Sequence, residues 1–144
     1  MSIIFIANVG NRDVQLPGRG DLPSGGAREL GETILGNWDA YAADIQLPIL
    51  GKALDWVARV HERVDKVVLV ASDQEDAQFR KGDTAPLAEV IRRILTGAAP
   101  WAERIPSGDV SIERVVGNPA DYDVMMRFYE GLMQTLASES TGKV

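Results

Sequence analysis

The sequence predicts an α/β protein whose mainly parallel sheet is covered by helices on both faces. Two uninterrupted apolar runs carry this prediction: Ile3–Ala7 near the start of the chain and Val67–Val70 near its middle. Short apolar runs of β-forming residues are typical of strands buried on both faces, as in parallel sheets. Segments with the apolar spacing of amphipathic helices separate and follow these runs. At 144 residues the chain has the size of one domain, and we expect a single domain over 1–144.

The helices are predicted from apolar spacing and from start and stop residues. A first helix is expected over 27–35. Pro48 begins a second, longer helix with a buried stripe of Leu50, Ala53, Leu54 and Val57. Trp56 falls off that stripe, so it either covers an edge of the core or belongs to a subunit interface. Asp83 or Thr84 is expected to cap the next helix, which ends at Gly97.

A third strand and a last helix complete the expected elements. Residues 98–108 are expected to form a connection. The strand is marked by Val110, Ile112, Val115 and Val116, and the polar residues among them indicate an exposed sheet edge. A broad stripe of Met and aromatic residues runs from Tyr122 to Leu136. We interpret this stripe as core, although its width also leaves room for a partner helix or a downstream segment.

The segment after the first strand is a candidate binding site, because open α/β folds bind ligands outside the carboxyl ends of their strands. Gly10 allows backbone N–H groups to approach a ligand, Asn11 can donate and accept hydrogen bonds, and Arg12 offers a planar fork suited to phosphate. We therefore expect an anion-binding loop, for a nucleotide, formed by Asn8, Val9, Gly10, Asn11, Arg12 and Asp13.

The loop is expected to continue as a long exposed segment, because residues 10–26 contain five glycines and two prolines. Arg19 within this segment and Arg28 beside it either add to a positive pocket or are solvated. We favour the interpretation that both arginines are solvated.

A second group of polar residues follows the second apolar run. If the two strands are neighbours, Ser72, Asp73 and Gln74 lie across the crevice from the first loop and can bind the same ligand. The carboxylates there also allow a magnesium site, but we favour a solvated helix entry. Lys81 and Thr84 lie near the start of the following helix, where either an anion or simple capping is expected; we favour capping.

In this order and spacing the segments resemble CARF domains, the Rossmann-like sensors of type III CRISPR systems. The resemblance is carried by Val-Gly-Asn-Arg-Asp after the first strand, the strand from Lys66 to Ser72, Lys81-Gly82-Asp83-Thr84 and Pro119-Ala120-Asp121-Tyr122-Asp123. It implies a Rossmann-like sheet that binds a cyclic oligoadenylate through the first loop, Ser72, Asp73, Gln74, Lys81 and Thr84. The Gly-Thr-Pro-type turn of a further family strand is missing before Lys143-Val144. We therefore expect a sheet that is incomplete at its carboxy-terminal side, in a fragment or a reduced domain.

Three functions follow from this resemblance. The leading one is a sensor in antiviral defence that holds cyclic tetra- or hexa-adenylate across a homodimer, since the even symmetry of the ligand suits a two-fold axis near the first loops. The second is a slow ring nuclease that positions a ribose 2′-hydroxyl in line with the phosphate, with help from Asn11, Arg12 and Ser72. The third is a ligand-free dimerisation module. A carboxy-terminal or separate effector is implied, and we expect a second copy or a partner polypeptide to cover the free edge of the first strand.

Composition excludes other classes. A formal net charge of −6 argues against duplex nucleic acid as the main partner, because such binding needs a basic surface. The chain has no cysteine and one histidine, His61, so we expect neither a zinc site nor a cofactor that needs thiolates. Neither the P-loop nor the Rossmann glycine pattern is present, which disfavours a dinucleotide-dependent oxidoreductase. The first apolar run is too short for a signal peptide or a membrane span, so we expect a cytoplasmic protein.

Overall fold

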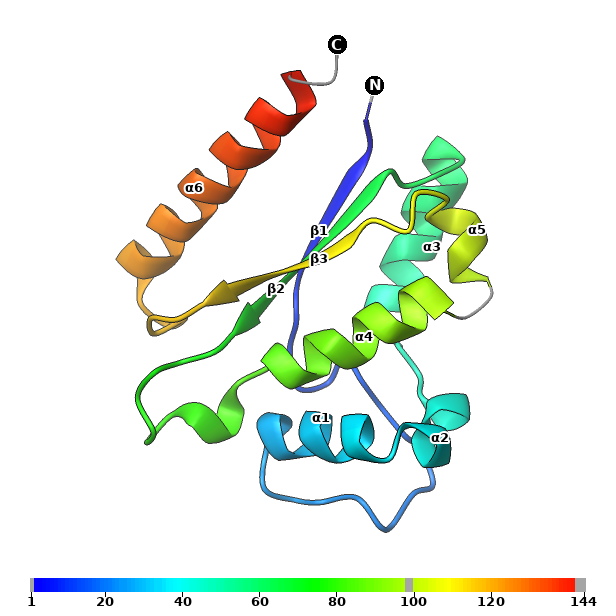
Figure 1. The fold of residues 1–144 in the computed structure, drawn as a ribbon, viewed down its shortest axis with the longest axis vertical. Helices are drawn as coiled ribbons and strands as arrows, with labels where there is room; N and C mark the ends of the chain where they lie inside the picture. The colour runs from blue at the N-terminus through cyan, green and yellow to red at the C-terminus, as the bar shows by residue number, and fades with distance from the viewer. Residues whose placement is uncertain (1, 98–99, 142–144) are drawn as a thin grey trace.

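A parallel sheet of three strands with helices on both faces forms the described part of the chain, residues 2–97 and 100–141 of a computed structural model (Figure 1). The strands are β1 (Ile4–Asn8), β2 (Lys66–Ser72) and β3 (Val110–Val115), in the order β1-β2-β3. The predicted α/β class with a parallel sheet is therefore confirmed. Expectations for Lys143 and Val144, and for residues 98–99 of the predicted connection, fall outside the described residues.

The central strand is β2, which pairs in parallel with β1 on one side and with β3 on the other. The register places Ile6 beside Val68 and Leu69 beside Ile112. Side chains from Val67 to Ala71 are buried, as expected for a strand covered on both faces. The predicted adjacency of the first two strands is confirmed, and so is the edge position of the third.

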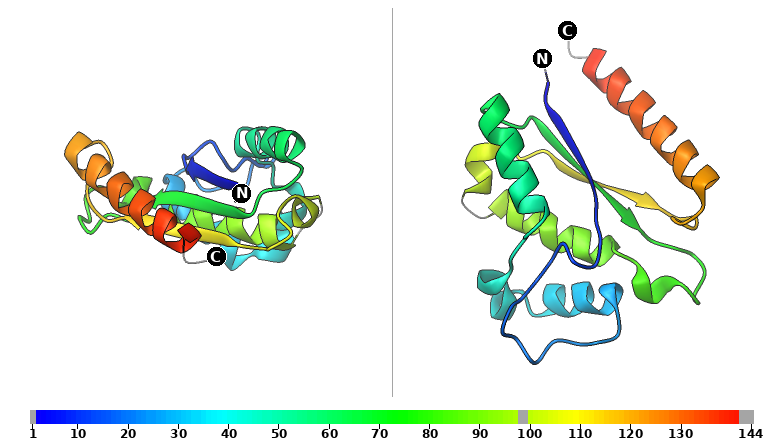
Figure 2. Two further views of the ribbon diagram at one scale, coloured as in Figure 1. Left: turned by 90° about the horizontal axis from the view of Figure 1, so that it is seen from above. Right: turned by 180° about the vertical axis from the view of Figure 1, so that it is seen from behind.

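Two apolar cores of unequal size hold the helices to the sheet. On one face, alternate β2 residues (Val67, Leu69, Ala71) pack in a large cluster with α1 (Ala27–Gly36), α3 (Leu50–His61) and α4 (Ala85–Gly97). On the other face, Val68 and Val70 pack under α6 (Tyr122–Thr141) (Figure 2). The alternation follows from the two-residue period of a strand, which sends successive side chains to opposite faces.

The four long helices lie where the apolar spacing predicts them, and α3 begins two residues after Pro48. The shorter elements are absent from the prediction. They are α2 (Trp38–Tyr41), α5 (Trp101–Arg104) and two 3₁₀ turns, η1 (Ala42–Asp44) and η2 (Arg80–Gly82). Elements of three or four residues complete about one helical turn, so they show no apolar period that a sequence pattern can detect.

The long segment after β1 is not simply exposed, which corrects the sequence prediction. Val14 and Leu16 are buried in the large core. Between them, Gln15 forms an isolated antiparallel bridge with Gln46, with hydrogen bonds of 2.9 and 2.8 Å between their backbones. Glycine and proline residues predict an irregular backbone, but the buried side chains of Val14 and Leu16, two residues apart, anchor this segment in the core.

None of the helices in the described ranges has the length and apolar character needed to cross a lipid bilayer.

Candidate functional site

A pocket lies at the carboxyl ends of the strands, where an open α/β fold is expected to bind a ligand. It has a volume of about 230 Å³. Four predicted site residues line it: Asn8, Val9, Ser72 and Thr84. The remaining lining residues come from β2, β3, the loop after β3 and the first turn of α6, and they are apolar: Val70, Ala71, Val115, Pro119 and Met125. We call this cavity the strand-end pocket.

The first loop leaves β1 in a tight turn held by Asp13. The backbone N–H of Asp13 donates to the carbonyl of Gly10 at 3.2 Å, and the Asp13 carboxylate accepts the N–H of Gly10 at 2.6 Å. Asn11 and Arg12 therefore stand exposed at the tip of a preformed turn. The buried Asp13 organises this turn, and the N–H of Gly10 is already bonded, so a phosphate would meet the tip of the turn first.

Ser72 and Thr84, which both line the strand-end pocket, form two hydrogen bonds with each other. The Ser72 N–H donates to the Thr84 hydroxyl oxygen at 3.0 Å, and the Thr84 N–H donates to the Ser72 hydroxyl oxygen at 3.1 Å. This reciprocal pair fastens the end of β2 to the residue before α4. Thr84 thus precedes the helix as predicted, but its hydroxyl oxygen bonds to the neighbouring strand.

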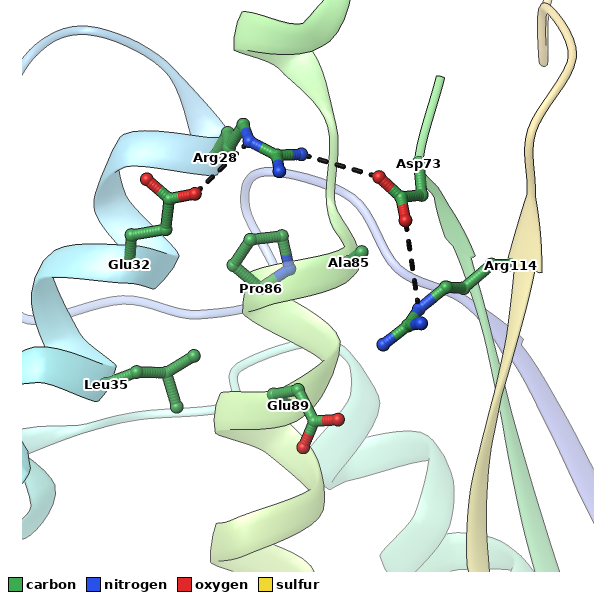
Figure 3. A pocket seen from close by; sticks show the side chains of 8 residues that line it. All are labelled: Arg28, Glu32, Leu35, Asp73, Ala85, Pro86, Glu89 and Arg114. Atoms are coloured by element: carbon green, nitrogen blue, oxygen red, sulfur yellow. Dashed lines mark hydrogen bonds and ion pairs between the residues drawn. The ribbon is translucent and has the colours of Figure 1, made fainter. Parts of the chain in front are cut away.

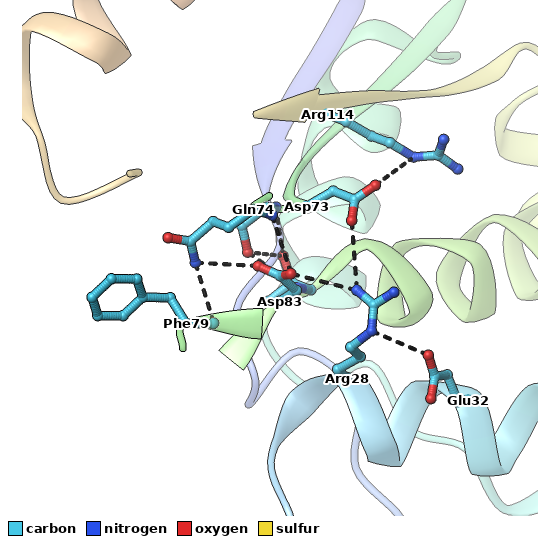
Figure 4. A network of polar contacts seen from close by, with 9 residues as sticks. Arg28, Glu32, Asp73, Gln74, Phe79, Asp83 and Arg114 are labelled. Carbon is cyan, nitrogen blue, oxygen red and sulfur yellow. Dashed lines mark hydrogen bonds and ion pairs between the residues drawn. The ribbon is translucent and has the colours of Figure 1, made fainter. Parts of the chain in front are cut away.

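Asp83 is the most buried carboxylate of the network around the end of β2, with a fully buried side chain (Figure 4). It accepts the backbone N–H of Gln74 at 3.1 Å and the Gln74 side-chain amide at 3.2 Å. Arg28 from α1 lies 3.4 Å from the same carboxylate. A buried charge is tolerated when it is paired and hydrogen-bonded in this way. The Gln74 amide thus points to Asp83 within its own loop.

Asp73 belongs to a second pocket of about 250 Å³, between α1 and α4 (Figure 3). Its carboxylate bridges Arg28 at 3.5 Å and Arg114 of β3 at 4.0 Å, and Arg28 also pairs with Glu32 at 3.2 Å. Lys81 is exposed on η2 and lines a different pocket, together with Gly25 and Glu29. Neither Asp73 nor Lys81 lines the strand-end pocket.

The arginines flanking the first loop are not free charges, which corrects the expectation that they are solvated or add to a positive pocket. Arg19 pairs with Asp21 at 3.1 Å and with Asp44 at 2.9 Å, and its guanidinium stacks on Tyr41. The hydrogen bond from Arg19 lowers the pKa of Asp21, and the bonds to both carboxylates raise the pKa of Arg19. Arg28 is similarly surrounded by carboxylates. Within the described residues, the Arg12 guanidinium has neither a hydrogen bond nor an ion pair, so its charge remains available.

Two residues of α6 were not predicted to be part of the site. Met125 lines the strand-end pocket, and the Tyr129 hydroxyl donates a short hydrogen bond to the Asn8 side-chain oxygen. Both belong to the Met and aromatic stripe, which the sequence analysis assigned to the core. The contact leaves the two N–H groups of the Asn8 amide for other partners.

The fold and this pocket define a small parallel α/β unit with a crevice at its strand ends. Comparisons with protein-family models, with curated proteins and with solved structures found no match. Across residues 2–97 and 100–141, no three His, Cys, Asp or Glu side chains come together as metal ligands.

Proposed function

We propose that this chain is a Rossmann-like sensor domain of type III CRISPR defence that binds a cyclic oligoadenylate at the first loop and the strand-end pocket. One observation carries the proposal. An unpaired guanidinium stands at the tip of a preformed turn, and this turn begins one residue after Val9, which lines a pocket at the strand ends. The segments that resemble CARF domains support the choice of ligand. The β1-β2-β3 order of parallel strands is consistent with a Rossmann-like sheet.

One part of the ligand would enter the strand-end pocket, and another part would lie outside it, beside the charged first loop. At about 230 Å³ the strand-end pocket is smaller than the 300–1,000 Å³ typical of pockets that enclose whole drug-sized ligands. It therefore accommodates part of a nucleotide, with apolar walls for a base and the Asn8 amide for its polar edge. The phosphates would lie outside, where Arg12 and Asn11 are exposed.

An acidic protein can bind such a ligand when one local cation is free. Within the described residues, Arg19 and Arg28 near the loop are neutralised by carboxylates, so Arg12 is the arginine of this region that offers a phosphate an uncompensated charge. A charge-assisted bond between guanidinium and phosphate is frequently bidentate and roughly twice as strong as a neutral one.

Replacing Arg12 tests the proposal. Arg12→Ala should weaken binding of cyclic tetra- or hexa-adenylate about 10- to 100-fold, because a hydrogen bond to a charged group contributes about 1.5–3 kcal/mol. The melting temperature should stay unchanged, since the Arg12 side chain has no partner to lose. Isothermal titration calorimetry measures the affinity and differential scanning fluorimetry the melting temperature.

Arg59→Ala is the matched control. Arg59 is 76% exposed on the last turn of α3, next to the amino-terminal end of β2, and among the described residues it pairs with Asp55 of its own helix alone. Its replacement removes the same charge and should leave the affinity unchanged. Unchanged affinity in Arg12→Ala would remove the first loop from the site. No binding of either ligand by the unaltered chain would instead support a ligand-free module.

The same titration separates the remaining alternatives. A shared pocket across a homodimer requires one ligand per two chains, whereas independent pockets require one per chain. Chromatography of the titrated mixture detects linear adenylate products if the chain is a ring nuclease. The leading proposal is a sensor, so we expect binding without rapid cleavage.

A further inference from the structure

Among the described residues, three polar side chains line the strand-end pocket, and two of them bond to each other. Each hydroxyl oxygen of Ser72 and Thr84 accepts a backbone N–H, and the two hydroxyl groups lie 3.4 Å apart, close enough for one to donate to the other. The third polar side chain is the amide of Asn8, at the end of β1. This amide is therefore the polar group of the pocket that is best placed to bond to a base.

The Asn8 side chain lies on the face of the sheet that α6 covers. It alternates along β1 with Ile4 and Ile6, which pack against the smaller of the two apolar cores. The strand register places Asn8 beside Val70, which belongs to the same core and also lines the strand-end pocket. The amide thus stands at the border between the core under α6 and the pocket.

Tyr129 of α6 reaches this amide from a fixed position. Its ring packs against the smaller core and meets the ring of Phe128 edge to face, with 5.6 Å between the ring centroids. Met125, one turn earlier on the same side of α6, lines the pocket. The first turn of the helix is capped by Asp121, whose carboxylate accepts two backbone N–H groups at 2.9 and 3.3 Å. Core packing and the cap therefore hold the Tyr129 hydroxyl beside the end of β1.

The hydrogen bond between Tyr129 and Asn8 decides which way the amide is turned. The Tyr129 hydroxyl donates to the Asn8 side-chain oxygen, whereas the Asn8 side-chain nitrogen has no partner within the described residues. A carboxamide carries an acceptor oxygen and a donor NH₂ group on the two sides of one planar group. Because Tyr129 engages the oxygen, the NH₂ group is the side of the amide that remains for a ligand.

We propose that Tyr129 is a positioning residue that fixes the Asn8 amide as a hydrogen-bond donor, so that the strand-end pocket binds the acceptor side of a base. The acceptor is a ring nitrogen or a carbonyl oxygen. Adenine offers acceptors in its ring nitrogens, whereas its exocyclic amine is a donor. The inference rests on the part of the proposed function that places a base in this pocket, and it specifies which side of the base is bound.

The amine of adenine does not fit the position beside Asn8. It would bring two donors together, and both would lack a partner in a pocket whose walls are otherwise mainly apolar. A polar group that is removed from water without a partner loses the free energy of its bonds to water. A ring nitrogen in the same place completes a hydrogen bond instead. The pocket therefore does not require the amine, and it accepts a carbonyl oxygen in place of the amine.

Nuclear magnetic resonance titrations of the full chain test this inference with three nucleoside monophosphates. Adenosine monophosphate carries the amine, inosine monophosphate has a carbonyl oxygen in its place, and purine riboside monophosphate has hydrogen there. We expect purine riboside monophosphate to bind within about threefold of adenosine monophosphate, because no bond to the amine is lost. Inosine monophosphate should bind at least as tightly as adenosine monophosphate. The backbone amides of Val9 and Ser72 report binding at the pocket.

Variants of the two side chains should change the ratio of the affinities for adenosine and inosine monophosphate. Asn8→Asp keeps the shape of the side chain and replaces the NH₂ group by an acceptor oxygen, so the ratio should shift about tenfold toward adenosine monophosphate. The added charge acts on both phosphates alike and cancels in the ratio. Tyr129→Phe frees the amide to turn, so its shift should have the same direction and a smaller size. Tyr122→Phe is the matched control: Tyr122 is 74% exposed at the start of α6, and its replacement should leave the ratio unchanged.

The unliganded chain provides a second measurement that needs no nucleotide. The carbon resonance of the Asn8 side-chain carbonyl should shift in Tyr129→Phe, because its hydrogen-bond donor is lost, and should stay in place in Tyr122→Phe. An unshifted resonance in Tyr129→Phe would overturn the positioning role of Tyr129.

Three results of the titrations would overturn the inference: equal affinity ratios in all four chains, a loss of affinity of about tenfold or more when the amine is absent, or no binding of any monophosphate at the pocket. Cyclic tetra- and hexa-adenylate take no part in this ranking. If they fail to bind while the monophosphates follow the expected order, the sensor is rejected and the orientation of Asn8 stands. If they bind while Asn8→Asp leaves the ratio unchanged, the sensor stands and the orientation is rejected.

Discussion

Asp65 ties together the starts of two neighbouring strands. Its carboxylate accepts the Ile3 N–H at 2.8 Å and the Arg63 guanidinium at 2.9 Å. These hydrogen bonds, that from Ile3 first, lower the pKa of Asp65. Because the fold favours the charged form, the stabilisation is present above the unfolded pKa of about 3.9 and is lost as the pH falls through the lower folded pKa.

Asp65→Asn should therefore lower the free energy of unfolding by about 1–2 kcal/mol at pH 7, because an amide oxygen accepts the same hydrogens without a charge. The difference from the unaltered chain should shrink below about pH 4, where the carboxyl group becomes protonated. Urea denaturation at both pH values measures it. Asp39→Asn, on an exposed residue of α2, is the control. An equal loss at both pH values would show that the charge of Asp65 contributes nothing.

Several residues that were predicted to contact a ligand instead form hydrogen bonds within the protein. Asp13 binds the turn, Ser72 and Thr84 bind each other, and Gln74 binds Asp83. A hydroxyl or carboxylate at a strand end looks the same in a sequence whether it binds a ligand or the next loop. The two cases differ in whether a hydrogen-bond partner from a distant part of the chain lies within bonding distance, and the sequence does not show that distance. That these residues gather at the strand ends was predictable, because parallel strands end at one side of a sheet.

Among the elements, α1 and α4 approach closely at Gly31. A Cβ atom on Gly31 would lie 2.6 Å from the Pro86 Cβ and 2.7 Å from the Leu87 nitrogen. Both neighbours belong to the first turn of α4, which the Ser72–Thr84 pair holds to β2. The close approach is therefore fixed from two sides, and the helices must separate to admit a larger side chain.

Gly31→Ala should destabilise the fold by about 1–3 kcal/mol, the usual cost of overpacking. Gly131→Ala in α6 is the matched control: nothing lies within 4 Å of its added methyl group, so it should stabilise the helix by up to about 1 kcal/mol. Thermal denaturation followed by circular dichroism compares the two variants. A stable Gly31→Ala variant would mean that α1 moves freely on α4.

The long elements were predictable because each carries its own apolar period over at least ten residues. The elements against which they pack could not be predicted. The buried run of β2 requires cover on both faces, yet nothing in the stripe of α6 says which face it takes or that Tyr129 reaches Asn8. The pairing of Gln15 with Gln46 is equally hidden, since the apolar alternation around each glutamine covers only three residues, too few to mark a strand.

On the scale of the whole molecule, the two faces of the sheet differ in how firmly they are covered. Three long helices share the large core, whereas in the described part of the chain α6 is the one helix on its face, where Leu132 and Leu136 are buried against Val68, Val70 and Val115. Local opening costs less free energy where fewer apolar contacts are lost. α6 should therefore open before the remainder of the fold.

Native-state hydrogen exchange measures this order. The amides of Leu132 and Leu136 should exchange at least tenfold faster than those of Val90 and Ile91. This corresponds to an opening free energy lower by about 1.4 kcal/mol or more. Low urea should leave the fast amides unaffected while it accelerates the slow ones, because local opening exposes little surface and global unfolding exposes much. Equal protection and equal urea dependence in both helices would show that the small core and the large core unfold as one cooperative unit.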